Sequence, residues 1–373
     1  MKSLEPWPES VELKDILADL LACNQRHIYQ KEDYMFVDVM YVVMTYTYQH
    51  FEFCPIMYIT SPVPGCGKTT NLDWFKKYCK QPRLSGNISA SSLFRTVDEE
   101  KPTMLIDELD TINDEMRREI GNLLNNGYQK EGGGVMRVEN TDNGGREPKS
   151  FDVYGPKIVS CIGAGSFSDA TASRSIHKRM GRRPKDRGRP FRISRIDSAD
   201  VCRKLFRWAK DNKEMIEKRC CMDLPIPEKL TDREADMWEG LFILSGFAGQ
   251  VWEERMYNAA IALTGSCKDD TISMQELILQ HCQNYILFKK KEKITSEDFA
   301  NYINRQSDWK EYPSQNLTPH KLASLLRDFG VFPKVIHFPE KGGKKYRGYE
   351  ASSFEDAFQS YLSPYDPSET VTA

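Results

Sequence analysis

The spacing of apolar residues changes along the chain and predicts a succession of differently folded regions. Near the N-terminus, apolar residues recur every three or four positions, which predicts helices. Farther on, short continuous apolar runs alternate with amphipathic stretches, a pattern typical of strands and helices around a buried parallel sheet. Helical spacing then returns, and the last region ends in short strands. We therefore expect a helical region at 1–53, an α/β core at 54–197, a second helical region at 198–268 and a C-terminal domain at 269–373.

The core is expected to be a three-layer α/β sandwich, because its strands and helices alternate. One segment interrupts the alternation: two short strands on either side of 140–145 predict a β-hairpin. The hairpin signal alone is compatible with a surface decoration and with a functional element. The remaining core elements are predicted as strands at 55–60, 83–89, 103–107 and 157–163, and helices at 68–79, 91–97 and 113–126.

The C-terminal domain has its own order of elements. Helices are expected at 272–288 and 295–304, and Thr318 with Pro319 supplies the N-cap and first position of a third helix. A lysine- and glycine-rich turn then separates two short strands. This order of helices followed by a hairpin predicts a winged-helix domain.

The composition is that of a globular protein with no global attraction to nucleic acid. The 373 residues are 40% hydrophobic and 28% charged, with a formal net charge of −2, so nucleic-acid binding would need local basic clusters. The ten cysteines contain no C-x-x-C pair, which favours reduced thiols and a cytoplasmic protein. We expect no signal peptide and no membrane partner, because the most lipid-like segment carries Asp38, His50 and Glu52.

Residues 58–70 read Tyr-Ile-Thr-Ser-Pro-Val-Pro-Gly-Cys-Gly-Lys-Thr-Thr, an apolar strand followed by a glycine-rich turn. Such a turn before a helix presents backbone N–H groups to a phosphate. Lys68 would contact the β- and γ-phosphates of ATP or GTP, and the Thr69 hydroxyl would hold Mg²⁺. Pro62 stands where the motif has glycine, and a chance turn is the alternative. The expected nucleotide-binding residues are Pro64, Gly65, Cys66, Gly67, Lys68, Thr69 and Thr70.

A second apolar strand, 103–106, ends in Asp107 and Glu108. Ligands of parallel sheets bind at the carboxyl ends of the strands, which is where these two acids fall. Asp107 would bind the Mg²⁺ shell, and Glu108 would orient or deprotonate the attacking water. The alternative is an acidic helix N-terminus, because a helix is expected shortly afterwards. Together with the glycine-rich turn, the two acids favour nucleotide hydrolysis.

The motifs resemble those of the AAA+ ring-forming ATPases, whose phosphate loops commonly read G-P-P-G-x-G-K-[ST]. Pro64, Gly65, Gly67, Lys68 and Thr69 match that string, and Pro62 departs from it. The chain is also similar to an uncharacterised ATPase family of phages and mobile elements that is linked to primases and replicative helicases. That similarity extends over most of the chain, at 60–62, 66–69, 87–89, 93–95, 105–108, 154–157, 174–176, 232–233, 235–236, 238–239, 295–298 and 317–319.

The resemblance implies a P-loop ATPase core of the AAA+ kind, a helical lid at 198–268, ATP and Mg²⁺ as ligands, and a homo-oligomeric, hexameric ring. Arg174 occupies the position of an arginine finger that reaches the γ-phosphate of a neighbouring subunit; a solvated basic run is the alternative. Arg233 is the candidate sensor arginine, or an ordinary residue of a first helical turn. For the sensor-one position, Ser160 and Ser166 are the candidates.

Two tasks fit this resemblance. The first is a DNA helicase or replication-associated motor of a mobile element, acting on single-stranded or forked DNA with a primase or other replication proteins. The hairpin occupies the position of the pore hairpin of ring helicases. The second is an ATPase that remodels or loads proteins or acts as a defence switch; a small-molecule kinase fits the two acids less well. The candidate DNA contacts are Arg137, Arg146, Lys149, Arg179, Arg182, Arg183, Lys344 and Lys345.

Overall fold

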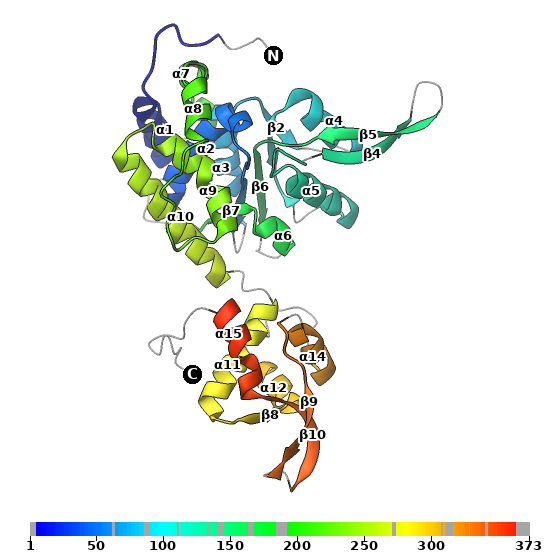
Figure 1. Ribbon diagram of the computed structural model, residues 1–373. Helices are drawn as coiled ribbons and strands as arrows, with labels where there is room; N and C mark the ends of the chain where they lie inside the picture. The colour runs from blue at the N-terminus through cyan, green and yellow to red at the C-terminus, as the bar shows by residue number, and fades with distance from the viewer. Residues whose placement is uncertain are drawn as a thin grey trace. The chain divides into compact units, whose positions relative to one another are not determined.

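The chain folds into two compact units, Met1–Asp270 and Thr271–Ala373. The computed structural model (Figure 1) describes residues 5–61, 64–85, 90–109, 112–132, 134–140, 145–162, 168–183, 192–270, 274–306, 309, 316–327, 329–339 and 342–362. The first unit contains a parallel sheet with helices on both sides, so the predicted mixed α/β architecture is confirmed.

The sheet of the first unit consists of five strands in the order β2-β3-β6-β1-β7. Every neighbouring pair is parallel, so the carboxyl ends of all five strands lie along the same edge of the sheet. In this order β6 lies between β1 and β3, the two strands on which the candidate chemistry depends. The strands are β1 (Ile56–Ser61), β2 (Pro82–Ser85), β3 (Thr103–Ile106), β6 (Lys157–Ile162) and β7 (Ser175–Arg179).

Side chains of each strand alternate between the two faces of the sheet and enter two different cores. On β1, Met57 and Ile59 belong to the larger core, with α2 (Glu32–Thr47) and α3 (Lys68–Tyr78). Ile56 and Tyr58 belong to the other core, with α4 (Ala90–Glu100) and α5 (Asp114–Asn126). The sheet is therefore covered by helices on both faces, as the alternating sequence pattern predicts.

The edge strand β7 was not expected from the sequence. Its residues Ser-Ile-His-Lys-Arg contain a single aliphatic side chain and read as part of a basic run. In the structure Lys178 points into the larger core and is fully buried beside Asp38 of α2. A lysine neutralised by a buried carboxylate thus occupies a core position that an apolar residue usually fills. The apolar pattern of the sequence therefore does not predict the strand.

The predicted hairpin is present. β4 (Gly134–Asn140) and β5 (Arg146–Asp152) pair antiparallel as a separate two-stranded sheet, and residues 141–144 of the turn lie outside the described residues. The hairpin projects from the body of the first unit beside α4 and α5 (Figure 1).

Further helices complete the first unit and pack mainly on the larger core. Thr231 and Glu234 form a reciprocal capping box at the start of α9 (Asp232–Ser245). No helix within the described ranges is both long and apolar enough to cross a membrane. These helices are α1 (Leu13–His27), α6 (Asp169–Ala172), α7 (Ala199–Asp211), α8 (Lys213–Arg219), α9 (Asp232–Ser245) and α10 (Gln250–Asp270), with 3-10 turns at Tyr48–His50 and Ile193–Arg195.

The second unit has a core of its own, which includes the fully buried Trp309, Phe299 and Tyr349. Its antiparallel sheet has the order β8-β10-β9. The short strand β8 and the last helix, α15, were not predicted. The elements are α11 (Met274–Lys289), β8 (Lys293–Thr295), α12 (Ser296–Ile303), α14 (Pro319–Arg327), β9 (Lys334–Phe338), β10 (Lys344–Glu350), a 3-10 turn at Ala351–Phe354, and α15 (Glu355–Tyr361).

Candidate functional site

The glycine-rich turn connects the end of β1 to the start of α3. Gly65 and Gly67 have φ angles of 79° and 88°, in the left-handed region where a side chain would be strained. α3 begins directly after Gly67, and the backbone N–H of Asn71 donates to the Gly67 carbonyl at 2.9 Å. Pro62, the residue that departs from the motif, lies outside the described residues. The two glycines thus provide the turn on which the motif depends.

Three features of this turn suit an anion. The first N–H groups of any helix have no intrahelical acceptor, and Gly67 at the N-cap has no side chain to cap those of α3. Lys68 directs its Nζ to the Ser61 hydroxyl at the end of β1, at 2.6 Å. Pro64, Gly65 and Thr69 are exposed and Thr70 is partly exposed, whereas Cys66 is buried. The turn is therefore open on the side where N–H groups, an ammonium and a hydroxyl meet.

The two acids lie at the same edge of the sheet. Asp107 follows β3, and its Oδ1 accepts hydrogen bonds from the Ser160 hydroxyl on the neighbouring strand β6 and from the Glu108 backbone N–H. Glu108 is exposed and has a φ of 54°, which is uncommon for a residue with a side chain and costs free energy. Ser160 is one of the two sensor-one candidates; Ser166 lies outside the described residues.

A divalent metal fits this chemistry. Thr69 and Asp107 offer oxygen ligands, which Mg²⁺ prefers. Across the part of the chain that the structure describes, no three His, Cys, Asp or Glu side chains form a metal-binding group. Mg²⁺ is usually held by one or two protein oxygens together with phosphate oxygens and water, so a complete protein cage is not required.

Arg174 and Arg233 lie together at the opposite edge of the sheet. The carbonyl of Arg174 accepts from the N–H of Ile56, the first residue of β1. The Arg174 guanidinium donates to the Ala170 carbonyl at 2.6 Å and lies 5.8 Å from the ring centre of Tyr128. Arg233, in the first turn of α9, donates to the Ser173 hydroxyl at 3.1 Å. The length of β1, about 17 Å at 3.3 Å per residue, separates this pair from the glycine-rich turn.

The three basic residues of the hairpin have different surroundings. Arg137 forms an ion pair with Glu119 of α5, and its guanidinium lies 4.2 Å from the ring centre of Phe94 on α4. It therefore fastens the hairpin to the body of the unit. Arg146, near the turn, is exposed; Lys149 is also exposed, with its ammonium 5.0 Å from the ring centre of Phe151. Arg146 and Lys149 are thus the ones presented to solvent.

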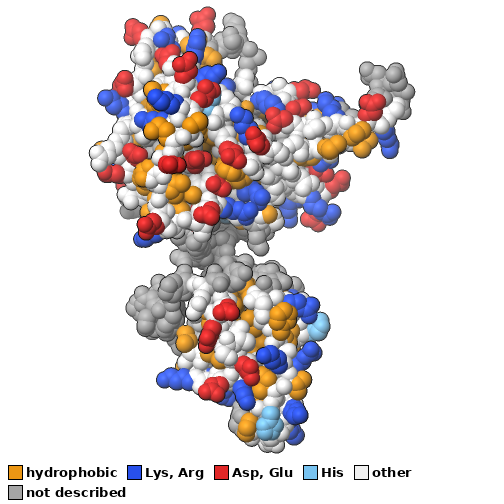
Figure 2. Space-filling model, viewed as in Figure 1, with side chains coloured by type: hydrophobic (Ala, Val, Ile, Leu, Met, Phe, Trp, Pro, Cys, Tyr) orange, Lys and Arg blue, Asp and Glu red, His pale blue; other side chains and the backbone are white. Residues whose placement is uncertain are grey.

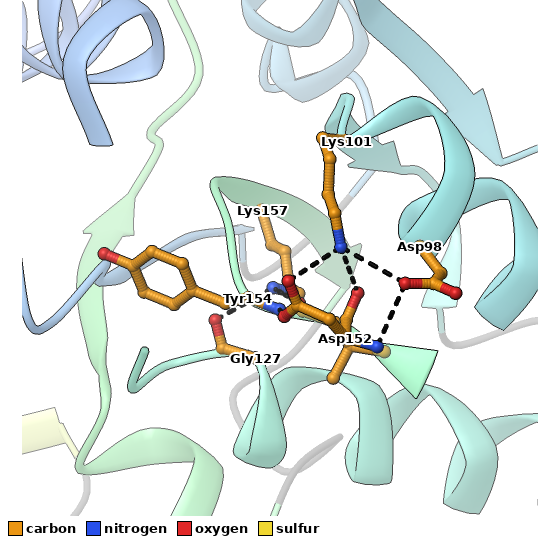
Figure 3. A network of polar contacts seen from close by, with 7 residues as sticks. Asp98, Lys101, Gly127, Asp152, Tyr154 and Lys157 are labelled. Carbon is orange, nitrogen blue, oxygen red and sulfur yellow. Dashed lines mark hydrogen bonds and ion pairs between the residues drawn. The ribbon is translucent and has the colours of Figure 1, made fainter. Parts of the chain in front are cut away.

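A polar network fixes the base of the hairpin (Figure 3). Lys101, just after α4, donates to the carboxylate of Asp152 at 2.7 Å and to that of Asp98 at 3.3 Å. The buried Lys157 donates to the carbonyls of Gly127, Val153 and Gly155 at 2.8–3.0 Å, which ties the end of α5 to the segment after β5. Burial lowers the pKa of Lys157 to about 8.

The remaining candidate DNA contacts lie at the surface. Lys344 and Lys345, at the start of β10 in the second unit, are both exposed. Strands β9 and β10 form an antiparallel hairpin, and Figure 2 shows Lys, Arg and His side chains along it. Arg179, the last residue of β7, and Arg182, which follows the strand, are exposed, and Arg183 is partly buried. The backbone N–H of Arg179 donates to the Tyr34 hydroxyl at 3.2 Å.

Sequence reasoning assigned no role to several residues around the glycine-rich turn. Ser61 contacts Lys68, and Asn71 of α3 contacts both Asp38 and Lys178. The one available signal was Asp38, an acid within an otherwise apolar helix, which served only to exclude a membrane span. The pairing of Asp38 with a strand 140 residues away carries no local pattern.

Known proteins resemble this chain in part. A family model described as "Protein of unknown function (DUF3631)" matches residues 179–361, which begin after the glycine-rich turn and the two acids. A curated relative, the "Uncharacterized 28.9 kDa protein in xis 5'region" of Saccharopolyspora erythraea, is 29% identical over 176 residues, covering 46% of this chain and 64% of the relative. The chain thus spans just under two thirds of that relative's length.

Two solved structures are similar at a coarse level. The apo structure of the NrS-1 C-terminal region has a TM-score of 0.42 and 14% identity, covering 93% of this chain and 77% of the other. The structure of JCV helicase bound to a thiazolopyridine compound has a TM-score of 0.30 and 12% identity, covering 72% and 65%.

Proposed function

We propose that this protein is a ring-forming P-loop ATPase of the AAA+ kind that uses ATP hydrolysis to act on DNA. The observation that carries the proposal is the hydrogen bond from Ser160 to Asp107. The bond joins the end of β3 to β6, and β6 pairs in parallel with both β3 and β1, so the acids after β3 lie at the same edge of the sheet as the glycine-rich turn after β1. A phosphate cradle and carboxylates at one edge are the two parts that nucleotide hydrolysis requires.

The residues of this edge have distinct roles in the proposal. The N–H groups of the turn and Lys68 hold the β- and γ-phosphates. Thr69 and Asp107 hold Mg²⁺, which neutralises charge on the phosphate oxygens. Glu108, exposed at the end of β3, orients the attacking water and accepts its proton. The positive φ of Glu108 stores strain at the position where the proposal needs a fixed carboxylate.

The placement of Arg174 and Arg233 supports the proposed ring. Both residues lie at the edge of the sheet opposite the glycine-rich turn, so they cannot reach a nucleotide bound at the turn of their own chain. Paired on one surface, they can instead face the γ-phosphate bound by a neighbouring copy. An arginine supplied in this way contributes about 10³–10⁵ in rate by neutralising charge in the transition state. Each active site would then be shared between two subunits.

The projecting hairpin and the second unit are the proposed DNA contacts. Arg146 and Lys149 present positive charge on the hairpin, whereas Arg137 is engaged with Glu119. In the second unit, the helices α11, α12 and α14 and the basic hairpin formed by β9 and β10 support the proposal of a winged helix, with Lys344 and Lys345 in its wing. Contacts with phosphates would make binding independent of sequence and sensitive to salt.

One observation favours a second candidate, an ATPase that remodels protein. Met136 and Val138 on the outer side of β4 are 70% and 67% exposed, and hydrophobic side chains are visible along the hairpin in Figure 2. An exposed apolar pair suits a polypeptide better than a phosphate backbone. Substitutions of the basic pair and of the apolar pair of this hairpin can therefore distinguish a function on DNA from a function on protein.

ATP hydrolysis measured with and without a single-stranded oligonucleotide tests the DNA proposal. We expect stimulation that is lost when Arg146 and Lys149 are both changed to Gln, with the unstimulated rate unchanged. The matched control is Lys14→Gln with Lys218→Gln, which removes two exposed lysines elsewhere on the first unit. Hydrolysis that no nucleic acid stimulates, but that Met136→Ser with Val138→Ser alters in the presence of an unfolded polypeptide, would favour the remodelling function.

A further inference from the structure

The buried helix α2 carries a single charged residue beyond its first turn, Asp38. Its carboxylate is inaccessible to solvent and pairs with the equally buried ammonium of Lys178 on β7. A buried carboxylate is tolerated only when its charge and hydrogen-bonding capacity are satisfied. Three side-chain amides complete the set: Asn71 donates to Oδ2 at 2.9 Å, Gln30 at 2.8 Å and Asn24 at 3.3 Å.

Asn71 connects this ion pair to the glycine-rich turn. It lies in the first turn of α3, three residues after Lys68, and its backbone N–H donates to Gly67. Its side chain donates to Asp38 and accepts from Lys178 at 3.0 Å, so both halves of its amide are engaged. The first turn of α3 is therefore fixed by two charged groups from two other elements.

The segment at the end of β7 also lies against the glycine-rich turn. The N–H of Met180 donates to the Thr60 carbonyl on β1 at 2.8 Å. The methyl group of Met180 lies 3.6 Å from the position where a Cβ on Gly67 would stand. Lys178 lies two residues before Met180. A displacement of Lys178 would therefore move the groups that contact Asn71 and those that lie beside Gly67.

We propose that Asp38, Asn71 and Lys178 are positioning residues that hold the first turn of α3, and with it the phosphate loop, in the geometry that binds nucleotide. This inference rests on the proposed ATPase function and extends it to the N-terminal helical region. That region supplies Asp38, which acts on the nucleotide site through Asn71 and Lys178.

Asn71→Leu tests the link, because it keeps the approximate volume and removes both amide contacts. We expect the affinity for a non-hydrolysable ATP analogue with Mg²⁺, measured by calorimetry, to fall by about tenfold or more, since small displacements of binding groups are costly. In turnover, KM should rise more than kcat falls. The matched control is Gln30→Leu, which removes a donor to the same carboxylate from outside α3 and should leave the affinity unchanged.

The double variant Asp38→Asn with Lys178→Met separates positioning from stability. Asp38→Asn alone leaves a buried lysine without its counter-charge and should lower the melting temperature strongly. Removing both charges should restore much of the melting temperature while the affinity for the analogue stays low. A double variant with native affinity would overturn the inference, and so would equal losses in Asn71→Leu and Gln30→Leu. If the unaltered protein binds no nucleotide, the proposed function itself fails.

Discussion

The Ser160 hydroxyl donates a hydrogen bond to Oδ1 of Asp107, joining β6 to the end of β3. The Glu108 N–H donates to the same oxygen at 3.0 Å, so two donors orient the carboxylate that would hold Mg²⁺ in the proposed function. Because β6 lies between β1 and β3, Ser160 stands on the strand next to both the one that leads into the glycine-rich turn and the one that leads into the two acids. A change at Ser160 therefore acts first on Asp107, the acid that it contacts.

Ser160→Ala should weaken the metal site without removing a ligand. Partners that orient metal ligands typically contribute about 10–100-fold in metal affinity or activity. We therefore expect the Mg²⁺ concentration for half-maximal ATP hydrolysis to rise by about tenfold or more. Ser175→Ala, which alters a buried serine at the opposite edge of the sheet, is the control and should not change it. An unchanged Mg²⁺ dependence in Ser160→Ala would remove the role given to this hydrogen bond.

Arg174 and Arg233 should act on the neighbouring subunit. Arg174→Ala is expected to lower kcat by about 10³-fold or more with little change in nucleotide affinity. When Arg174→Ala subunits are mixed with Glu108→Gln subunits, some interfaces combine the intact Glu108 of one subunit with the intact Arg174 of its neighbour. Hydrolysis should then exceed the sum of the two inactive preparations. If mixing restores nothing although mixed oligomers form, the arginine does not act between subunits.

The hairpin should contribute two charges to DNA binding. For single-stranded DNA the slope of log K against log salt is about −0.7 per phosphate contact. Changing Arg146 and Lys149 to Gln should therefore reduce its magnitude by about 1.4, as measured by fluorescence anisotropy. Arg137→Gln should instead lower thermal stability, because it breaks the ion pair with Glu119. A slope unaffected by the first change would exclude the hairpin as a phosphate contact.

Lys157 should give the first unit a specific dependence of stability on pH. Burial lowers its pKa from 10.5 to about 8 in the folded state. Below pH 8 both states hold the proton; between pH 8 and 10.5 only the unfolded state keeps it, so stability rises with pH. The difference in unfolding free energy between the unaltered protein and Lys157→Met should thus increase by about 3 kcal/mol at most over this interval. Chemical denaturation at several pH values measures it, and a constant difference would contradict the shift.

Local patterns predicted much of this fold. Continuous apolar runs predicted β1, β3 and β6, and the turn residues at 140–145 predicted the hairpin. Thr318 and Pro319 predicted the start of α14 in the same way. These features depend on neighbouring residues, which is why the sequence is sufficient to find them.

The missed features depend on contacts between distant residues. β7 lacks an apolar pattern because Lys178 is neutralised by Asp38, and neither residue predicts its partner. Arg137 looks like a phosphate contact in the sequence, but in the structure it pairs with Glu119 of α5. Arg233 reads as a residue of the first helical turn, and only the fold brings it beside Ser173 at the edge opposite the glycine-rich turn.

The central claim is that the glycine-rich turn and the acids after β3 hydrolyse ATP. The most direct measurement is phosphate release from ATP with Mg²⁺ by the unaltered protein, Lys68→Ala and Glu108→Gln, alongside nucleotide binding by each. The account predicts turnover by the unaltered protein, loss of binding in Lys68→Ala, and retained binding without turnover in Glu108→Gln. Normal hydrolysis by Glu108→Gln would contradict it.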